Sequence, residues 1–187
     1  MGQYPDLYIL RHGETKWNTL GKFQGHKNSP LTETGKAQAR MQNKILDRLP
    51  NCPPDAFVSP QERAMHTAQI ALPQHVSKQT DDRLMEIAFG QWEGATKDYI
   101  RSQITCPYDS YQWFFQSPGG ESFEMIAQRA QSFLANLKTP TLVVTHGVTS
   151  MVLRGLWLGL DLNDLLKLSR TQGCVFHLSN ETETILT

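Results

Sequence analysis

The sequence predicts an α/β fold, a three-layer sandwich with a mostly parallel central sheet flanked by helices. Short apolar runs rich in strand-forming residues alternate with segments of helical period, and this alternation is typical of parallel sheets covered on both faces. Two of the runs, residues 7–10 and 141–145, lead into a histidine followed by a glycine. Strands that are joined by right-handed helical crossovers run parallel, so both histidines are expected at the same edge of the sheet, where the strands have their carboxyl ends.

The first part of the chain supplies two strands and two helices of this sandwich. Residues 7–10 form the first strand, and residues 20–31, rich in Gly, Asn, Ser and Pro, form a loop. Thr32 is the expected N-cap of a helix. Its apolar stripe is expected at Ala37, Met41, Ile45 and Leu49. Residues 56–58 form a second strand, and the Ser-Pro pair after it begins a helix over 61–72.

The remaining elements complete the alternation. Residues 76–79 are predicted as an edge strand and residues 83–94 as a structured loop with two glycines. A long helix follows, since its apolar residues recur at helical spacing. They are Phe123, Ile126, Ala127, Ala130, Phe133, Leu134 and Leu137. The strand at 141–145 then leads into a helix over 148–158, and residues 174–178 form the last strand.

Length and charge limit the kinds of partner. With 187 residues, the chain is expected to form one domain over 1–187 with a core that needs no covalent support. Lys plus Arg and Asp plus Glu number 18 each, so the formal net charge is zero. Without a basic field, neither nucleic acid nor a membrane is an expected partner. We expect a small ligand held by local charges, on a monomer or a homodimer.

The cysteines and the first residues predict a cytoplasmic location. The three cysteines are widely spaced and form no Cys-x-x-Cys pair, so free thiols in a reducing compartment are expected, with one intermolecular disulfide as the alternative. Residues 1–6 have neither the basic nor the apolar stretch of a secretory signal, and no run of 18 apolar residues occurs.

Four residues near strand ends are candidates for an anion site. Arg11 and His12 follow the first strand, His146 follows the strand at 141–145, and Arg63 lies about one turn into the helix after the second strand. Two guanidinium groups and two imidazoles suit one tetrahedral dianion, because the arginine fork matches phosphate oxygens. The glycine after each histidine is expected to let the backbone approach a ligand closely.

These residues belong to a longer ordered series of motifs. The series opens with Arg11-His12-Gly13-Glu14-Thr15 and closes with Thr145-His146-Gly147. Between them come Trp17-Asn18, Gln24-Gly25, Ser29-Pro30-Leu31-Thr32 with Gly35, Ser59-Pro60, Arg63-Ala64, Thr67-Ala68, Glu86 with Gly90, Trp92-Glu93-Gly94 and Pro118-Gly119-Gly120-Glu121-Ser122. Over residues 7–178 the series resembles the histidine phosphatase superfamily, in its phosphoglycerate mutase-like branch, and so implies a phosphoglycerate mutase-like fold. Asn28 replaces an aspartate that is common before the Ser-Pro-Leu-Thr block.

The resemblance implies roles for most of these residues. His12 would be the nucleophile that forms a phosphohistidine, and Glu86 would be the proton donor to the leaving alcohol and later the base for water. The residues that would bind the phosphoryl oxygens are Arg11, Arg63, His146 and Asn18. The residues that would contact the rest of the substrate are Gln24, Gly25 and Gly147.

No metal and no cofactor is expected. The chain has no His-Glu-x-x-His motif, Cys/His cluster or Gly-rich P-loop, and an imidazole is nucleophilic near neutral pH without a metal. Other histidines have no comparable context. His66 is expected on a helix surface and His177 packed on a strand.

The branch contains phosphatases and mutases, and the segment after the Trp-Glu-Gly block favours a phosphatase. Residues 95–120 are interpreted as a short, lid-like insertion that carries only Lys97 and Arg101 near the mouth. A mutase must retain a bisphosphate, which requires more cations, so we expect a phosphoric monoester hydrolase acting on a small-molecule phosphate ester. The alternatives are a cofactor-dependent phosphoglycerate mutase-type phosphotransferase and a catalytically silent regulatory module.

Five aromatic residues in this insertion have two interpretations. They are Tyr108, Tyr111, Trp113, Phe114 and Phe115. They either pack the insertion onto the body of the protein, which we favour, or form a wall that accepts an apolar leaving group.

Overall fold

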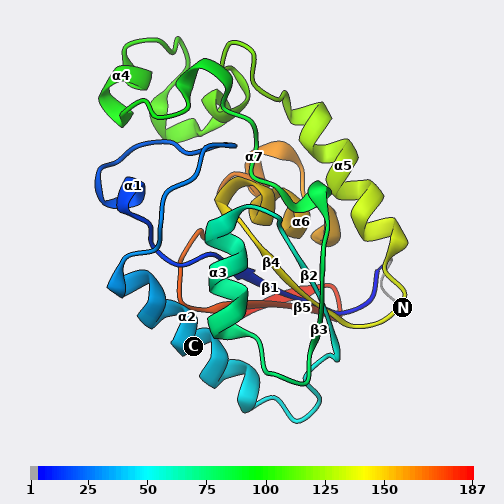
Figure 1. The fold of residues 1–187 in the computed structure, drawn as a ribbon. Helices are drawn as coiled ribbons and strands as arrows, with labels where there is room; N and C mark the ends of the chain where they lie inside the picture. The colour runs from blue at the N-terminus through cyan, green and yellow to red at the C-terminus, as the bar shows by residue number, and fades with distance from the viewer. Residues whose placement is uncertain (1–3) are drawn as a thin grey trace.

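The computed structural model describes residues 4–187 and confirms the predicted sandwich (Figure 1). Residues 1–3, part of the segment expected to carry no secretory signal, lie outside the described residues. One sheet has the strand order β3-β2-β4-β1-β5-β6. Its strands are β1 (Leu7–Arg11), β2 (Asp55–Val58), β3 (Ser77–Thr80), β4 (Thr141–Thr145), β5 (Val175–Ser179) and β6 (Thr182–Leu186). The pairs β1–β4, β2–β4 and β2–β3 are parallel, while β5 runs antiparallel to both β1 and β6.

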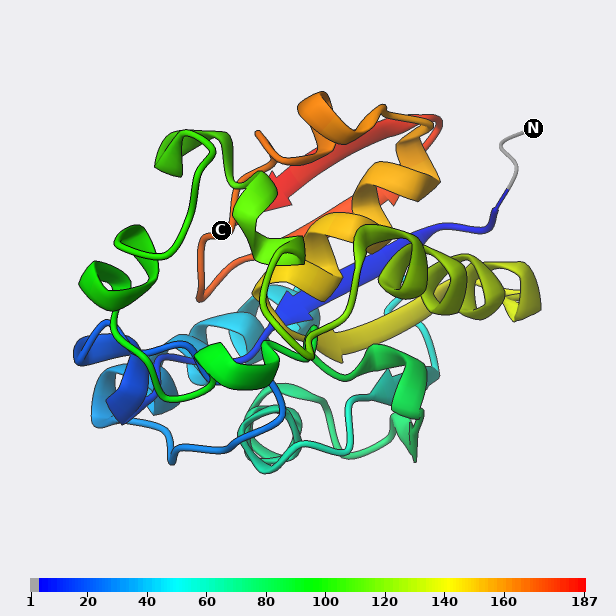
Figure 2. The same cartoon turned by 90° about the horizontal axis from the view of Figure 1, so that it is seen from above.

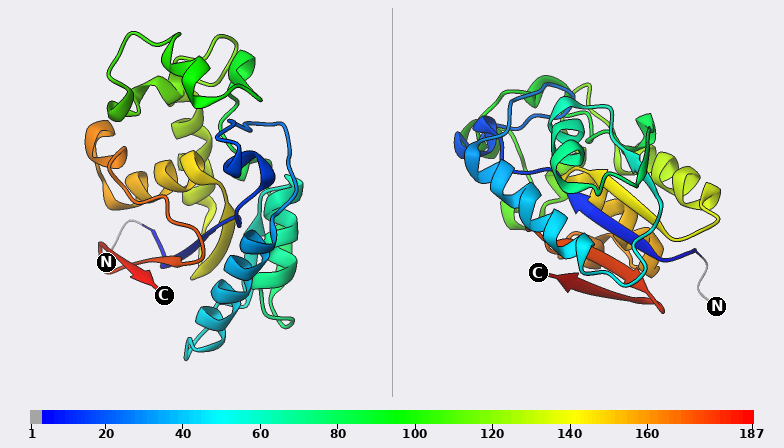
Figure 3. Two further views of the ribbon diagram at one scale, coloured as in Figure 1. Left: turned by 90° about the vertical axis from the view of Figure 1, so that its left-hand side faces the viewer. Right: turned by 60° about the horizontal axis from the view of Figure 1, so that its bottom comes forward.

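Four long helices form the outer layers, two on each face of the sheet (Figure 3). On one face lie α2 (Glu33–Asp47) and α3 (Glu62–Ala71), and on the other lie α5 (Phe123–Asn136) and α6 (Gly147–Leu158). The short helices are α1 (Lys16–Thr19), α4 (Lys97–Arg101) and α7 (Leu162–Leu165). The 3-10 turns are η1 (Asp82–Leu84), η2 (Gly90–Trp92), η3 (Tyr108–Ser110) and η4 (Gln112–Phe115). No helix among residues 4–187 combines the length and apolar character needed to cross a membrane.

The two-residue period of β1 divides the core into two halves. Leu7 and Ile9 are fully buried in the cluster formed with α5 and α6, whereas Leu10 is fully buried in the cluster formed with α2 and α3. Because neighbouring side chains of a strand point to opposite faces, a strand covered on both faces is apolar at both sets of positions. This explains why β1 and β4 appear as short continuous apolar runs.

The predicted core stripe of α2 is wrong in part. Ala37 and Met41 are exposed, Leu49 lies half-buried beyond the end of the helix, and of the four expected residues only Ile45 is buried. The buried residues of α2 are Gly35, Ala39, Gln42, Ile45 and Leu46. The stripe includes a buried polar residue, which a search for apolar spacing excludes. Gln42 donates from Nε2 to the carbonyl of Arg11 and to that of Cys174, both at 3.0 Å, and so joins the ends of β1 and β5. In α5, by contrast, the predicted stripe is confirmed by the burial of Ile126, Ala130, Phe133 and Leu134.

A buried ion pair attaches the C-terminal hairpin to α6. The Arg154 side chain is fully buried, and its Nε lies 2.6 Å from Glu183 Oε2 on β6. It also donates from Nη1 to the carbonyl of Ser169 at 2.6 Å and lies over the ring of Phe176 at 3.8 Å. The same guanidinium therefore fixes β6 and the loop that precedes β5.

The carboxyl end of β1 points toward the segment 95–120 and the loop around α1 (Figure 2). This is the edge at which α/β sheets bind ligands. The three cysteines, at positions 52, 106 and 174, form no disulfide with one another.

Candidate active site

The two strand-end histidines lie side by side, as predicted. Arg11 of β1 pairs with Thr145 of β4 in parallel register, and the backbone N–H of His12 donates to the carbonyl of Thr145 at 2.9 Å. The next residue along each chain is therefore brought to the same edge. The ring centroids of His12 and His146 are 5.1 Å apart.

A cavity of about 400 Å³ opens above this edge. All the predicted site residues except His146 line it, and the ring of His146 lies next to that of His12. The structure thus brings the predicted residues together from β1, α1, α3, the loop after η1 and the start of α6. They are Arg11, His12, Asn18, Gln24, Gly25, Arg63, Glu86 and Gly147.

His12 has one ring nitrogen committed and one available. Its Nδ1 lies 2.8 Å from the carbonyl of Gly13, and since a carbonyl only accepts, Nδ1 carries the proton and Nε2 the lone pair. Burial, then the charges of Arg63 and Arg11, place the pKa of His12 well below that of an ordinary histidine. A neutral imidazole with a free Nε2 in a cavity is a competent nucleophile.

His146 lies beside it and contacts Ser59. Its Nε2 lies 2.7 Å from Ser59 Oγ, which also accepts from the N–H of Gln61. In the tautomer in which Ser59 donates its hydroxyl proton to Nε2, Nδ1 of His146 carries the ring proton. Burial and the charge of Arg63 lower the pKa of His146 well below its usual value, so the neutral ring is favoured, and this tautomer leaves its Nδ1–H to donate to a ligand.

Several buried donors around His12 have no hydrogen-bond partner within residues 4–187. They are Nε of Arg11, Nε of Arg63 and Nδ1 of His146. Both guanidinium groups are otherwise anchored: Arg11 Nη1 donates to the carbonyl of Arg170, and Arg63 Nη2 donates to that of Gly25 at 2.8 Å. Burial lowers the pKa of Arg63 to about 10, which keeps it charged. Unpaired buried donors are costly, and a polyoxygen anion such as a phosphoryl group would satisfy them together.

Glu86 is held at the start of α6 with its carboxylate at the cavity wall. Its Oε1 accepts from the N–H of Thr149 at 3.1 Å and its Oε2 from that of Val148 at 3.2 Å. The N–H of Ile87 and the hydroxyl of Thr149 also contact Oε1, at 3.1 and 3.2 Å. Because helix N-termini present unsatisfied N–H groups, α6 holds this carboxylate in place at the wall of the cavity.

The loop after α1 contributes Asn18, Gln24 and Gly25. Asn18 uses its Oδ1 and its backbone in a capping box with Thr15, so its Nδ2 is the group left to donate into the cavity. Gln24 donates from Nε2 to Thr15 Oγ1 at 2.9 Å. Gly25 has a φ of +53°, a conformation that is strained for residues with a side chain, and a Cβ there would also displace the carboxylate of Glu93, so this turn favours glycine.

The two glycines that follow the histidines differ, contrary to expectation. A Cβ on Gly147 would lie 3.4 Å from Cζ of Arg11, so this glycine leaves room beside the guanidinium at the cavity wall. A Cβ on Gly13 would instead lie 2.2 Å from the carbonyl oxygen of Gly35. Gly13 is therefore required by the close approach of two backbones and not by a ligand.

The expectation of few cations near the mouth is wrong. Lys97 and Arg101 do line the cavity, but Lys22 from the loop after α1 and Arg170 from the loop before β5 line it as well. Among the lining residues of the described chain, Glu86 is the one carboxylate. A chain of zero net charge thus concentrates positive charge in one cavity.

Another cavity residue missed from the sequence, Gln172, holds the backbone of His12. It donates from Nε2 to the carbonyl of His12 at 2.8 Å. Its position and that of Arg170 follow from β5 running antiparallel to β1, because the residues before β5 then lie at the carboxyl end of β1.

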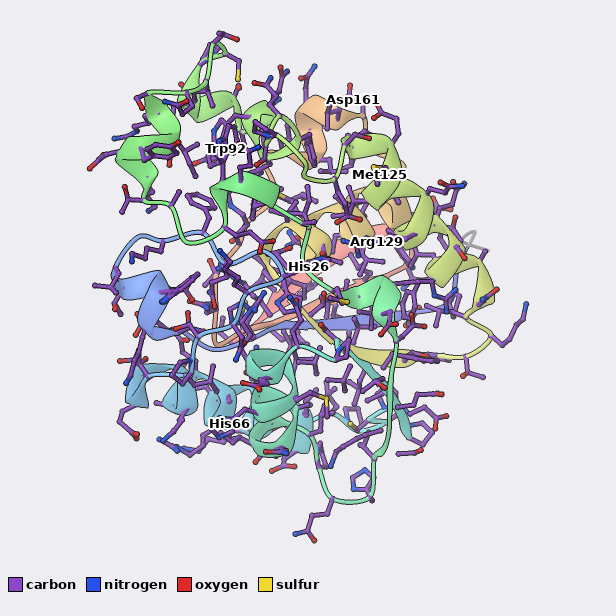
Figure 4. All side chains as sticks on the ribbon, turned by 45° about the horizontal axis from the view of Figure 1, so that its top comes forward. His26, His66, Trp92, Met125, Arg129 and Asp161 are labelled. Carbon is purple, nitrogen blue, oxygen red and sulfur yellow. The ribbon has the colours of Figure 1, made fainter. Side chains whose placement is uncertain are left out.

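The aromatic residues of 95–120 pack this segment onto the body, the interpretation that the sequence favours. Trp113 is 1% exposed and packs on Tyr108 at 4.9 Å, on Phe23 at 5.2 Å and on Trp92, labelled in Figure 4, at 6.3 Å. Four of the five rings also line the cavity. These four are Tyr108, Tyr111, Trp113 and Phe114.

Asn28 has a structural role that requires an amide side chain. Its Nδ2 donates to Glu62 Oε2 at 2.6 Å, and its Oδ1 accepts from the backbone N–H of Arg63 at 3.3 Å. An aspartate in this position would have no donor for Glu62. Asn28 therefore links the loop to the first turn of α3.

His66 and His177 lie where they were expected. His66 is exposed on α3 (Figure 4), and His177 stacks on Tyr8 at 4.1 Å between ring centroids. Among residues 4–187, no group of three His, Cys, Asp or Glu side chains is arranged to hold a metal ion.

Comparison with known proteins adds relatives that match nearly the whole chain. The family model described as histidine phosphatase superfamily (branch 1) matches residues 7–186. An acid phosphatase of Mycobacterium tuberculosis is 33% identical over 83% of this chain and 77% of its own length. An adenosylcobalamin/alpha-ribazole phosphatase of Salmonella typhimurium is 31% identical over 90% of this chain and 87% of its own. A crystal structure of phosphoglycerate mutase from Thermus thermophilus has a TM-score of 0.72 and 31% identity, with 97% of this chain and 96% of that chain covered.

Proposed function

Because this chain belongs to the histidine phosphatase superfamily (branch 1), we propose that it is a metal-independent phosphatase that hydrolyses a small-molecule phosphomonoester through a phosphohistidine on His12. The observation that carries the proposal is the neutral imidazole of His12, with Nε2 free at the cavity and unpartnered donors of Arg11, Arg63 and His146 around it.

The first step transfers the phosphoryl group to the enzyme. Nε2 of His12 attacks phosphorus as the bond to the ester oxygen breaks, and Glu86 gives its proton to the departing alkoxide, which leaves as the alcohol. The guanidinium groups of Arg11 and Arg63 bind the equatorial oxygens, where charge is spread in a loose in-line transition state. The Nδ1–H of His146 and the Nδ2–H of Asn18 are further donors to these oxygens.

The second step releases phosphate. Water takes the place of the alcohol, and the carboxylate of Glu86 accepts a proton from it as its oxygen attacks phosphorus. The bond between phosphorus and Nε2 breaks, and the electron pair returns to the imidazole. The hydrogen bond from Nδ1 of His12 to the carbonyl of Gly13 keeps the ring in the required tautomer through both steps.

Hydrolysis is favoured by the phosphatase names of the two relatives that share about a third of their residues with this chain. One observation favours a phosphoglycerate mutase-type phosphotransferase as a second candidate. The four cations beyond the phosphoryl clamp, Lys22, Lys97, Arg101 and Arg170, are the kind of group that would retain a bisphosphate while it reorients.

Phosphate release in the presence of EDTA is the first predicted result. The purified chain should hydrolyse p-nitrophenyl phosphate at the same rate with and without the chelator, because the lone pair of a neutral imidazole needs no metal to attack phosphorus. The measurement is the initial rate at pH values from 4 to 9. Loss of turnover in EDTA would rule out the metal-independent mechanism, and no turnover at any pH would favour a catalytically silent module.

The mutase alternative is tested in parallel with 3-phosphoglycerate. Formation of 2-phosphoglycerate that depends on 2,3-bisphosphoglycerate would replace the phosphatase proposal with that of a mutase.

The titration of His12 is expected in the acid range. Burial and two neighbouring guanidinium groups disfavour the imidazolium, so His12 should stay neutral as the pH falls through 6.5 and become protonated only well below it. Nitrogen-15 NMR of the imidazole in the free enzyme measures this pKa directly. In Arg63→Gln the pKa of His12 should rise, because one of the charges that lowers it is gone, whereas Arg63→Lys keeps the charge and should change it less. An imidazole that titrates at or above 6.5 in the unmodified protein would contradict this account of the nucleophile.

A further inference from the structure

Arg170 presents a guanidinium to the cavity that the phosphoryl chemistry does not use. Its Cζ lies 3.8 Å from the ring centroid of Tyr111 and 5.4 Å from that of Phe114. Stacking on aromatic faces holds a guanidinium in plane and leaves its N–H edges free for an oxyanion. Its Nη1 is buried and has no hydrogen-bond partner among the residues that the structure describes.

The backbone around this contact is constrained on both sides. Tyr111 has a φ of +56°, a left-handed conformation that is costly for a bulky residue and recurs at functional sites. It turns the chain between η3 and η4, which places the ring on Arg170. On the other side, the carbonyl of Arg170 accepts a hydrogen bond from Nη1 of Arg11. Arg170 therefore lies directly beside the phosphoryl clamp.

A second arginine is held on the same segment in a similar way. Cζ of Arg101 lies 4.2 Å from the ring centroid of Tyr108. Burial raises the pKa of the Tyr108 hydroxyl, and the charges of Arg101 and Arg170 both oppose that rise, which indicates that both guanidinium groups lie near this ring. Positive charge thus continues from Arg11 through Arg170 to Arg101.

These cations are not neutralised by the protein. Arg101 has one carboxylate near it, that of Asp98 at 3.8 Å, and the two side chains are 56% and 92% exposed, where such pairs contribute little. Arg170 has no ion pair among residues 4–187. Lys22 and Lys97 line the same cavity. Like charges gathered in a concave site without counterions raise the local concentration of anions.

We propose that Arg170, with Arg101, forms a second oxyanion subsite that recognises a carboxylate on the leaving-group side of the substrate. This inference rests on the proposed function, since it assumes that the clamp at His12 binds the scissile phosphoryl group. The substrate class is then a phosphomonoester with a second negative charge on its alcohol portion, lying along the rings of Tyr111 and Phe114.

Matched substrates test the subsite. In each pair, one member carries a second anion on its alcohol portion and the other carries a neutral group there. The pairs are 4-carboxyphenyl and 4-carbamoylphenyl phosphate, 3-phosphoglycerate and glycerol 3-phosphate, and the phosphate esters of ω-hydroxyalkanoates of different lengths with the corresponding amides. The quantity measured is the ratio of kcat/KM within a pair. For at least one spacer the charged member should be favoured about tenfold or more, the effect of one hydrogen bond between charged groups.

Variants then assign the preference to its residues. Arg170→Gln should bring the ratio of the favoured pair close to one, and Arg101→Gln should lower it in the same direction. The ratio is internal to each variant, so a general loss of activity cancels. Arg48→Gln, which removes an exposed arginine at the end of α2, is the matched control and should keep the wild-type ratio.

The outcomes separate the two proposals. If p-nitrophenyl phosphate is turned over but every charged and neutral pair gives a ratio near one, the subsite is wrong and the phosphatase stands. A preference that survives in Arg170→Gln also overturns the assignment. If no phosphate ester is turned over at all, the proposed function fails and the subsite with it. Raised KM with little change in kcat in Arg170→Gln would support a binding contact over a structural effect.

Discussion

Replacement of His12 by alanine is expected to abolish phosphate release. The variant loses the only atom that the proposed mechanism joins to phosphorus, and loss of a nucleophile in comparable two-step enzymes lowers kcat on the order of 10⁴- to 10⁶-fold. The side chain of His12 contributes a hydrogen bond to the carbonyl of Gly13 and a contact with the ring of His146, and alanine keeps the backbone hydrogen bonds of this residue to Thr145 and Gln172, so the fold should persist. The measurements are the rate on p-nitrophenyl phosphate and the thermal unfolding of both proteins.

Trapping of the intermediate completes this prediction. Radiolabelled substrate, stopped in alkali, should leave label on the wild-type chain, since a phosphoramidate survives alkali and is lost in acid. His12→Ala should carry no label, and His66→Ala, which removes an exposed imidazole on α3, should behave as the wild type. Retained turnover in the His12 variant, or alkali-stable label that persists in it, would show that another group is the nucleophile.

Substitution of Glu86 by glutamine should affect substrates according to their leaving groups. An alkyl phosphate needs a proton on its departing oxygen, so its kcat/KM is expected to fall about 10²- to 10⁴-fold, the usual contribution of general acid–base catalysis. The nitrophenolate ion leaves without that proton, so p-nitrophenyl phosphate should lose far less in the first step. The quantity to compare is the ratio of the two losses.

The ratio of the two losses also distinguishes the loss of a general acid from a structural disturbance caused by the Glu86→Gln substitution. Glutamine offers one oxygen where Glu86 offers two to the N–H groups of Val148 and Thr149, so its amide N–H₂ would face one of these donors and shift the start of α6. A shift of that kind would slow both substrates together. Equal losses would therefore argue against a general acid, and Glu124→Gln, an exposed change on α5, should alter neither rate.

The residues at the carboxyl ends of β1 and β4 could be predicted from the sequence because their positions follow from local rules. Apolar runs locate the strands, parallel pairing brings their ends together, and His12 and His146 then become neighbours. Arg63 was found in the same way, from its place near the start of a helix that follows a strand. In each case the chain direction alone decides where the side chain lies.

Arg170 of the second subsite and Lys22 at the same cavity could not be found by those rules. Both lie in irregular loops, whose course depends on tertiary contacts such as the hydrogen bond from Arg11 to the carbonyl of Arg170. The missing information was the direction of β5, which runs antiparallel to β1 and so brings the residues before it to the carboxyl end of β1. The β5–β6 hairpin turns at Asn180 and Glu181, both with positive φ, and an Asn-Glu pair is a weaker turn signal than Asn-Gly. The sixth strand is therefore absent from the prediction.

The buried pair of Arg154 and Glu183 has a consequence for how specificity can be exchanged between relatives. Arg154 joins the final hairpin to the carbonyl of Ser169, immediately before Arg170, so the path of the chain into Arg170 depends on this buried pair. A segment from Arg170 to the end of the chain, grafted onto a relative, should therefore place Arg170 correctly where the recipient supplies an arginine at the position of Arg154. Without that arginine, the graft would place the carboxylate of Glu183 at the buried site with no counterion, and recombination libraries should keep the two positions together.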